Sequence, residues 1–540
     1  MAAGEREVNG MPLAMAELTL EQQVAQMMMI GIPGQDVTPE CHEFFRDLGF
    51  GGAIIFGRNC ASLAQMRALT DGLQACAAGS AAGIPLLIAV DQEGGIVARL
   101  TEAHGAVTMP GAMALGATGD PELARAAAAA TARLLASVGA NMNLAPVADV
   151  NINPDNPVIG VRAFGEDPAA VARFVTAAID GTQSAGVLAT AKHFPGHGDT
   201  ETDSHLALPV IRHSRARLES VELVPFRAAI AAGVGAIMTA HIEFPAVAGD
   251  GLPATLSRPV LTGLLRGELG YTGLIATDCM EMSAIVRHFG SGEAAVRAVR
   301  AGADLIMVSH TPERQRESYR AILAATRCGD IPREQIAASV QRILTAKRRF
   351  AAARRAPLTD RELAAQRDLA ELIAARAVTV IRDRRRQPAS PLRPVCVAVG
   401  ETAITQAESG DGEPAVAAAL GGLFSGLRHA IVRDDGSGLR EALALAADCD
   451  QLIIAVGGLT AMPQRADAAA ALLAIARERG IPSVAIACRA PYDAQALAAD
   501  TVLATYDTRP ASMHAAAAVI AGRLVPRGRL PVMLTQSCSK

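Results

Sequence analysis

The chain has 540 residues, of which 50% are hydrophobic and 19% are charged, with a formal net charge of −4 and a sequence pI near 6.3. This length predicts two or three domains rather than one core, and the apolar content excludes extended disorder. The charge balance, without a basic stripe interleaved with aromatic residues, makes nucleic acid a poor candidate partner.

The N-terminal stretch MAAGEREVNGMPLAMAELTLEQQ carries charges of both signs and no apolar segment typical of a secretory signal. No apolar run reaches the roughly 18 residues that a membrane span requires. The nine cysteines are scattered without a CxxC pair, which is typical of free thiols in a reducing compartment. We therefore expect a cytoplasmic protein without a membrane span. Composition does not indicate an oligomeric state.

Eight short apolar runs recur through the first 310 residues and alternate with Ala/Leu/Arg segments of helical spacing, such as 120–139. Buried strands alternating with amphipathic helices predict a parallel sheet covered by helices. Eight such units fit a (β/α)8 TIM-type barrel, with an open doubly wound sheet as the alternative. The predicted strands cover residues 27–32, 52–57, 86–91, 141–147, 187–192, 236–241, 273–278 and 303–308.

Polar side chains gather where these predicted strands end. Active sites of such barrels lie at the C-terminal ends of the strands, so this asymmetry predicts a catalytic barrel. The residues are Asp91 with Gln92 and Glu93, Asp149, Lys192 with His193, His241 and Asp278.

The residue composition and pattern of the chain change after residue 355, so we assign the barrel to 1–355 and a helix with linker to 356–393. DRELAAQRDLAELIAARAVTVI (360–381) predicts a charged amphipathic helix, and an Arg- and Pro-rich connector follows it. Residues 394–540 predict a smaller three-layer α/β/α domain. Its glycine loops do not complete GxGxxG, so a dinucleotide site is not supported. Its predicted strands are 395–400, 429–434, 451–458, 483–488 and 501–506.

Residues 191–205, AKHFPGHGDTETDSH, have the densest polar character in the chain. His193 and His197 have the spacing of a helical zinc pair, but the intervening Pro195 and Gly196 disfavour a helix, and the Glu of HExxH is missing. Lys192 at a strand end is a candidate for Schiff-base chemistry if its neighbours lower its pKa. The alternative is a lysine that donates hydrogen bonds to substrate hydroxyl groups.

Proton transfer is the third use of this stretch. In an extended segment Asp203 and His205 lie on one side, where the carboxylate fixes the imidazole tautomer and raises its basicity. Such a pair is suited to general acid/base catalysis near neutral pH. Gly196 and Gly198 are potential hinges, so we expect the 196–205 loop to move and close on binding.

Asp278 is the last residue of the seventh predicted strand, 273–278. Its structural alternative is a helix N-cap for the segment after it. A carboxylate at a barrel mouth, opposite a proton donor, also fits glycosidic cleavage by double displacement, in which the carboxylate attacks the anomeric carbon. The residues alone leave both readings open.

Four blocks occur in a fixed order: AVDQEGG (89–95), NPVIGVRAFGEDP (156–168), AKHFPGHGDTETDSH (191–205) and ATDCMEM (276–282). Together they resemble glycoside hydrolase family 3, in its bacterial β-N-acetylglucosaminidase branch. The resemblance covers about 20–350, and more weakly the second domain through VPRGRLPVML (525–534). One departure is Ile96, where relatives often carry a basic residue, and we expect it to change the pocket rim.

The resemblance implies a retaining exo-hydrolase that removes terminal β-linked N-acetylglucosamine from muropeptide fragments or chito-oligosaccharides, with no metal or organic cofactor. Asp278 falls on the nucleophile position, and His205, oriented by Asp203, falls on the acid/base position. A glycoside phosphorylase with the same dyad, a β-glucosidase-type specificity and a non-catalytic sugar sensor are the alternatives. The residues that match the family's sugar-binding positions are Asp91, Arg99, Arg162, Lys192 and His193.

Overall fold

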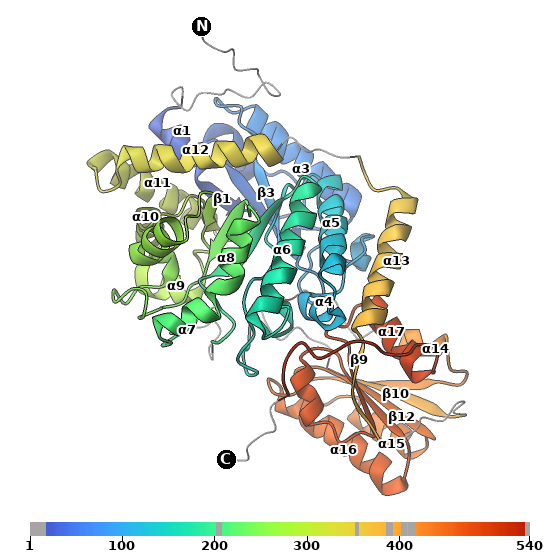
Figure 1. The fold of residues 1–540 in the computed structure, drawn as a ribbon. Coiled ribbons are helices and arrows are strands. Elements are labelled where there is room, and N and C mark those ends of the chain that lie inside the picture. The colour runs from blue at the N-terminus through green and yellow to red at the C-terminus, as the bar shows by residue number, and fades with distance from the viewer. Residues whose placement is uncertain are drawn as a thin grey trace.

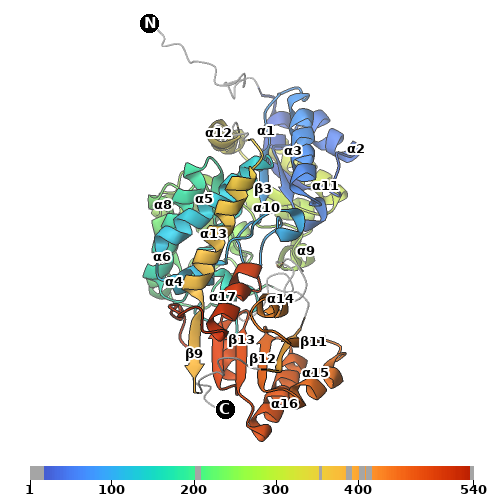
Figure 2. The ribbon, with the colours of Figure 1, turned by 90° about the vertical axis from the view of Figure 1, so that its right-hand side faces the viewer.

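A computed structural model describes residues 18–200, 208–351, 356–384, 392–400, 408 and 416–534 (Figure 1). The first part of the chain forms a barrel, and the second part forms a separate α/β domain at one end of it (Figures 1 and 2). Helix α13 (Asp360–Ala377) runs along the side of the barrel toward that domain (Figure 2).

Eight parallel strands build the barrel in the order β7-β6-β5-β4-β3-β2-β1-β8. A parallel bridge between Ala276 and Leu305 joins β7 to β8 and completes the ring. The predicted (β/α)8 barrel is therefore confirmed, and the open doubly wound alternative is wrong. The strands are β1 (Met28–Gly31), β2 (Gly52–Ile55), β3 (Leu87–Val90), β4 (Met142–Asn143), β5 (Leu188–Phe194), β6 (Ala236–Thr239), β7 (Leu274–Ala276) and β8 (Ile306–Val308).

Helices cover the outside of the barrel, and their first turns carry the expected N-terminal signals. Ser62, Asp120 and Asp167 each accept a hydrogen bond from a backbone N–H of the first turn. The longer elements are α1 (Leu20–Gln26), α3 (Leu63–Ala78), α4 (Ala112–Thr118), α5 (Pro121–Ser137), α6 (Pro168–Ser184), α7 (Arg215–Ser220), α8 (Leu223–Ala231), η7 (Pro259–Glu268), α9 (Ser283–Phe289), α10 (Ser291–Ala301), α11 (Pro312–Cys328) and α12 (Arg333–Phe350). Short helical turns are α2 (Pro39–Cys41), η2 (His42–Asp47), η3 (Gly57–Asn59), η4 (Glu102–His104), η5 (Gly160–Arg162) and η6 (Ala254–Leu256).

The second domain is a six-stranded sheet in the order β11-β10-β12-β13-β14-β9, parallel except for β9. Helices α15 and α16 pack on one face, and α14 and α17 pack on the other. This confirms the predicted three-layer arrangement. Its elements are β9 (Thr379–Asp383), β10 (Pro394–Val399), α14 (Val416–Gly421), β11 (Arg428–Val432), α15 (Leu439–Ala447), β12 (Gln451–Val456), α16 (Pro463–Arg479), β13 (Ser483–Ala487), η8 (Pro491–Gln495), β14 (Thr501–Ala504) and α17 (Pro510–Ile520).

The end of the predicted helix at 360–381 is wrong. Helix α13 ends at Ala377, and the next residues form strand β9, antiparallel to β14 at the sheet edge. The segment VTVI (378–381) consists of four successive β-branched residues, two valines, one threonine and one isoleucine, all of high strand preference. A sheet edge within reach therefore outweighs the helical pattern of the residues before it.

Two further expectations concern thiols and membranes. The eight cysteines that fall within the described ranges are free, and one of them is exposed. Among the helices of the described residues, none is both long and apolar enough to cross a membrane.

Candidate active site

A cavity of about 430 Å³ lies at the C-terminal ends of the barrel strands. Residues at or just after the ends of β2 to β8 line it, which is where barrel enzymes place their chemistry. Six of the eight residues that the resemblance assigned to catalysis or sugar binding meet around this one cavity: Asp91, Arg99, Arg162, Lys192, His193 and Asp278. Asp203 and His205 lie outside the described residues.

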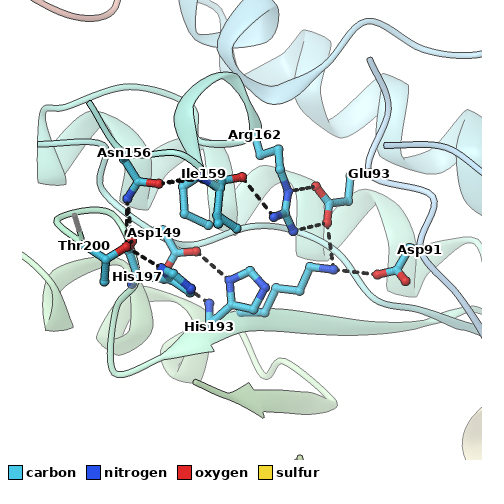
Figure 3. Close-up of polar contacts among 11 residues, drawn as sticks. Asp91, Glu93, Asp149, Asn156, Ile159, Arg162, His193, His197 and Thr200 are labelled. Atoms are coloured by element: carbon cyan, nitrogen blue, oxygen red, sulfur yellow. Dashed lines mark hydrogen bonds and ion pairs between the residues drawn. The ribbon is translucent and has the colours of Figure 1, made fainter. Parts of the chain in front are cut away.

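A buried ion network forms one wall of the cavity (Figure 3). Lys192 Nζ donates to Asp91 Oδ1 and lies 2.7 Å from both that atom and Glu93 Oε1. Arg162 donates through Nε and Nη2 to the two oxygens of Glu93, at 2.9 and 2.7 Å. Arg99 Nη2 lies 3.5 Å from Asp91 Oδ2. The carboxylate of Glu93 therefore bridges two cations, Lys192 near the end of strand β5 and Arg162 in the short helical turn η5.

The network fixes the charge state of its members. Burial raises the pKa of the Glu93 carboxyl, but the charges of Arg162 and Lys192 outweigh burial and hold that pKa well below its usual range. Burial lowers the pKa of Lys192, while Asp91 and Glu93 more than offset it and raise that pKa above its usual value. Lys192 is thus an ammonium donor, and the Schiff-base alternative, which needs a free amine, is disfavoured.

A second buried group orients the two histidines of this region (Figure 3). Asp149, with no exposed side-chain surface, lies 2.8 Å from His193 Nδ1 and accepts a 2.7 Å hydrogen bond from the His197 backbone N–H. His197 Nδ1 lies 2.9 Å from Thr200 Oγ1. Burial, and next the neighbouring His193, lower the pKa of His197 to about 4, so its ring is neutral at pH 7. Because Asp149 contacts its Nδ1, the His193 ring has a fixed orientation where it lines the cavity.

The structure does not support a zinc pair at His193 and His197. His193 belongs to strand β5, and the residues after it form a turn rather than a helix. Among the described residues, one group has metal-ligand geometry, namely Asp199, His213 and Glu222. Arg217 already binds Glu222 at 2.6 Å and supplies positive charge there.

Asp278 lines the same cavity and lies two residues after the end of β7. Its Oδ1 accepts a 2.7 Å hydrogen bond from the Cys279 backbone N–H. Helix α9 begins only at Ser283 with Met282 at its N-cap, so the N-cap alternative for Asp278 is wrong. Burial raises the pKa of Cys279 to about 11, and this thiol therefore stays protonated beside the carboxylate.

Three acidic residues take part in the site although sequence reasoning gave them no role. The sequence shows Glu93 and Asp149 as polar residues at predicted strand ends, which indicates that they lie near the site. It does not indicate their partners, which are distant in sequence. Glu281, which also lines the cavity, accepts hydrogen bonds from the backbone N–H groups of His310 and Thr311. His241, from the same set of strand-end residues, bonds Thr255 and the Cys279 carbonyl instead.

The first residues of the 196–205 loop are tightly packed. A Cβ on Gly198 would lie 1.7 Å from the Val150 carbonyl oxygen, and one on Gly196 would lie 2.8 Å from Glu222. Asn156 Nδ2 donates to the His197 carbonyl at 2.8 Å. Close approach therefore explains both glycines without a hinge, and residues 201–205 lie outside the described part of the chain.

A (β/α)8 barrel with a polar cavity at its strand ends, lined by paired carboxylates and cations, defines a barrel enzyme that acts on a small polar substrate. Residues 19–346 match the family model of the glycosyl hydrolase family 3 N-terminal domain. The chain belongs to glycosyl hydrolase family 3 and is therefore a glycoside hydrolase, as the resemblance predicted.

Three proteins that are similar to this chain illustrate the family. The chain is 37% identical over 370 residues to beta-hexosaminidase A of Pseudoalteromonas piscicida, a match that covers 62% of each protein. It is 40% identical, with a TM-score of 0.91, to a glycoside hydrolase family 3 beta-N-acetylglucosaminidase from Paenibacillus sp. str. FPU-7, covering 96% of this chain and 99% of that one. A beta-glucoside phosphorylase at 23% identity and a TM-score of 0.80, covering 96% of this chain and 95% of that one, shares the fold.

Proposed function

We propose that this protein is a retaining exo-acting β-N-acetylhexosaminidase. It removes terminal β-linked N-acetylglucosamine from muropeptide fragments or chito-oligosaccharides in the cytoplasm. Asp278 attacks the anomeric carbon and forms a covalent glycosyl intermediate. His205, oriented by Asp203, protonates the leaving oxygen and then activates the water that releases the sugar.

The observation that carries the proposal is the convergence of Asp278 with five polar sugar-binding candidates around one small cavity. Asp91, Lys192 and Arg162 offer charged hydrogen bonds to hydroxyl groups, and the network through Glu93 preorganises them. The cavity has room for a short sugar terminus and few aromatic side chains for a long polysaccharide. The names of the beta-hexosaminidase and beta-N-acetylglucosaminidase relatives support the choice of sugar.

A histidine suits the acid/base role in such an enzyme for an electrostatic reason. A carboxylic acid must have its pKa raised to stay protonated near neutral pH, whereas an imidazole has a pKa of about 6.5 without adjustment. A histidine also adds no second anion beside Asp278 when the substrate fragment is acidic.

The test is a panel of nitrophenyl glycosides assayed with wild type, Asp278→Ala and His205→Gln. We expect wild type to prefer the N-acetylglucosaminide over the glucoside. We expect Asp278→Ala to lower kcat by about 10⁴-fold or more and His205→Gln to lower it by about 10²- to 10⁴-fold. Near-normal turnover by His205→Gln would remove that residue from the mechanism.

A glycoside phosphorylase is the second candidate, because an acid/base dyad without a second anion tolerates phosphate as acceptor. The structural likeness to a beta-glucoside phosphorylase concerns the fold alone at 23% identity. Product analysis in phosphate buffer separates the two: free N-acetylglucosamine supports the hydrolase, and the sugar 1-phosphate supports the phosphorylase.

A further inference from the structure

The turn after Glu93 is the place where the catalytic barrel meets the second domain. Gly94 and Gly95 have positive φ angles of 96° and 55°, a conformation that favours glycine. The backbone N–H groups of Glu93 and Gly94 both donate to the Val97 carbonyl, at 3.0 and 3.1 Å. A Cβ on Gly95 would come within 2.8 Å of the Gly111 Cα, so the turn is closely packed. The position of the Glu93 carboxylate depends on this turn.

Two buried charged side chains of the second domain bind this part of the barrel. Arg509 Nε donates a 2.7 Å hydrogen bond to the Gly95 carbonyl oxygen. Asp507 Oδ2 accepts a 3.2 Å hydrogen bond from the Gly111 backbone N–H, and its Oδ1 accepts one from the Arg509 backbone N–H at 3.0 Å. Asp507 is 0% exposed and Arg509 is 6% exposed. Buried polar groups of this kind are costly to leave unpaired, which makes the contact specific.

An apolar contact reinforces the same junction. Ile96, the next residue of the turn, packs against a buried cluster that includes Met113 from the barrel and Tyr506 and Val532 from the second domain. The expectation that Ile96 changes the pocket rim is therefore wrong, since its side chain lies in the domain interface. A bulky apolar residue there is what an interface with a second domain requires.

The second domain also reaches the segment after strand β4. Tyr492, from the short helix η8, accepts a 3.1 Å hydrogen bond at its hydroxyl from Asn151 Nδ2. Asn151 has no exposed surface and lies two residues after Asp149, which orients His193. The second domain thus contacts the two segments that carry the buried anions of the site.

We propose that the second domain is a positioning element of the active site. Arg509 and Asp507 hold the turn that presents Glu93, and Tyr492 holds the segment that presents Asp149. Through these anions they set the placement of the sugar-holding cations and of His193. All described residues that line the cavity belong to the barrel, so these three act through others and are positioning residues. The effect on turnover rests on the proposed function.

The test compares Arg509→Met, Arg509→Lys and a matched control, Arg465→Met. Arg465 is equally buried, at 4% exposure, and its Nη1 donates to the Gly457 carbonyl at 2.8 Å, wholly inside the second domain. Each variant is assayed well below its Tm for kcat/KM on nitrophenyl N-acetylglucosaminide and for the inhibition constant of N-acetylglucosamine. Hydrogen exchange of the peptide spanning 92–100 gives a readout that needs no activity.

We expect Arg509→Met to lower kcat/KM about ten- to a hundredfold, because small misplacements of binding groups carry losses of this size. It should also weaken N-acetylglucosamine binding and speed exchange in 92–100, and Arg509→Lys should recover part of each. Arg465→Met should lower Tm without these changes. Three results would overturn the proposal. The first is an unchanged hydrogen-exchange rate of 92–100 in Arg509→Met, and the second is faster exchange with kcat/KM and the inhibition constant both at their wild-type values. The third is a loss of kcat/KM in Arg465→Met equal to that in Arg509→Met. A wild type that cleaves no nitrophenyl glycoside contradicts the proposed function instead, and exchange still decides whether Arg509 restrains the turn.

Discussion

At the scale of single residues, the chemistry of the site depends on which buried charges are paired. Glu93 is the residue on which two cations converge, and it was visible in the sequence only as one member of a polar run at a strand end. The positions of Asp91, Arg162, Lys192 and Asp278 around one cavity could be predicted from strand ends and motifs. The bridge through Glu93 could not, because its partners are 69 and 99 residues away along the chain.

Neutralising Glu93 tests this bridge. We expect Glu93→Gln to lower the free energy of unfolding by about 3–5 kcal/mol, because two buried cations then lose their shared anion. Thermal and urea unfolding measure the change. The control is Glu313→Gln, whose side chain is 79% exposed and lies 3.8 Å from Arg316, where we expect a change within about 0.5 kcal/mol. Equal effects of the two substitutions would contradict the bridging role.

Lys347 gives a pH-dependent prediction. It is fully buried with Gln26 Oε1 as its hydrogen-bond partner at 2.6 Å, and burial lowers its pKa from 10.5 to about 7. The unfolded chain therefore binds this proton more tightly than the folded protein does. The contribution of Lys347 to the free energy of unfolding is lowest below pH 7 and rises between about pH 7 and 10.

Replacing Lys347 tests this rise in the free energy of unfolding with pH. We expect the free energy of unfolding of Lys347→Met not to rise over that pH range as it does in wild type. We also expect Lys347→Met to be more stable than wild type at pH 6.5, which is about half a pH unit below the pKa of Lys347 in the folded protein. Lys347→Arg, which stays charged throughout, should be less stable at every pH and show no rise. Parallel Tm-against-pH curves for wild type and Lys347→Met would refute the assignment.

At the scale of elements, apolar runs and turns predicted all eight barrel strands, because each strand is buried on both sides and reads as a continuous apolar segment. Strand β9 was missed because it follows α13 without a break, and its pairing with β14 brings together residues about 120 positions apart. The close packing of Gly198 could not be predicted either, because it depends on the Val150 carbonyl of another loop.

Gly198 offers a test of how the loop after β5 is seated. We expect Gly198→Ala to lower stability by about 1–3 kcal/mol, since its Cβ would overlap the Val150 carbonyl oxygen and shift the backbone beside His197. It should also lower kcat/KM, measured on nitrophenyl N-acetylglucosaminide. Gly249→Ala is the matched control, because a Cβ there meets nothing within 4 Å. A mobile hinge at Gly198 would instead tolerate alanine as well as Gly249 does.

At the scale of the whole molecule, the sequence predicted a barrel followed by an α/β/α domain but not how the two domains meet. The interface rests on pairs such as Gly95 with Arg509 and Asn151 with Tyr492, which are separated by 414 and 341 residues. No local pattern encodes such a pair. For Asp203 and His205 the sequence supplies the information instead: their spacing supports an acid/base role, and both lie outside the described residues.

The proposed mechanism requires that Asp278 becomes glycosylated during turnover. Incubation with a slow fluorinated N-acetylglucosaminyl donor, followed by proteolysis and mass spectrometry, locates any covalent adduct directly. We expect one N-acetylfluoroglucosaminyl group per protein, on the peptide that contains Asp278 and on that side chain. An adduct on another residue, or no adduct together with the inverted anomer as the first product, would contradict the proposed mechanism.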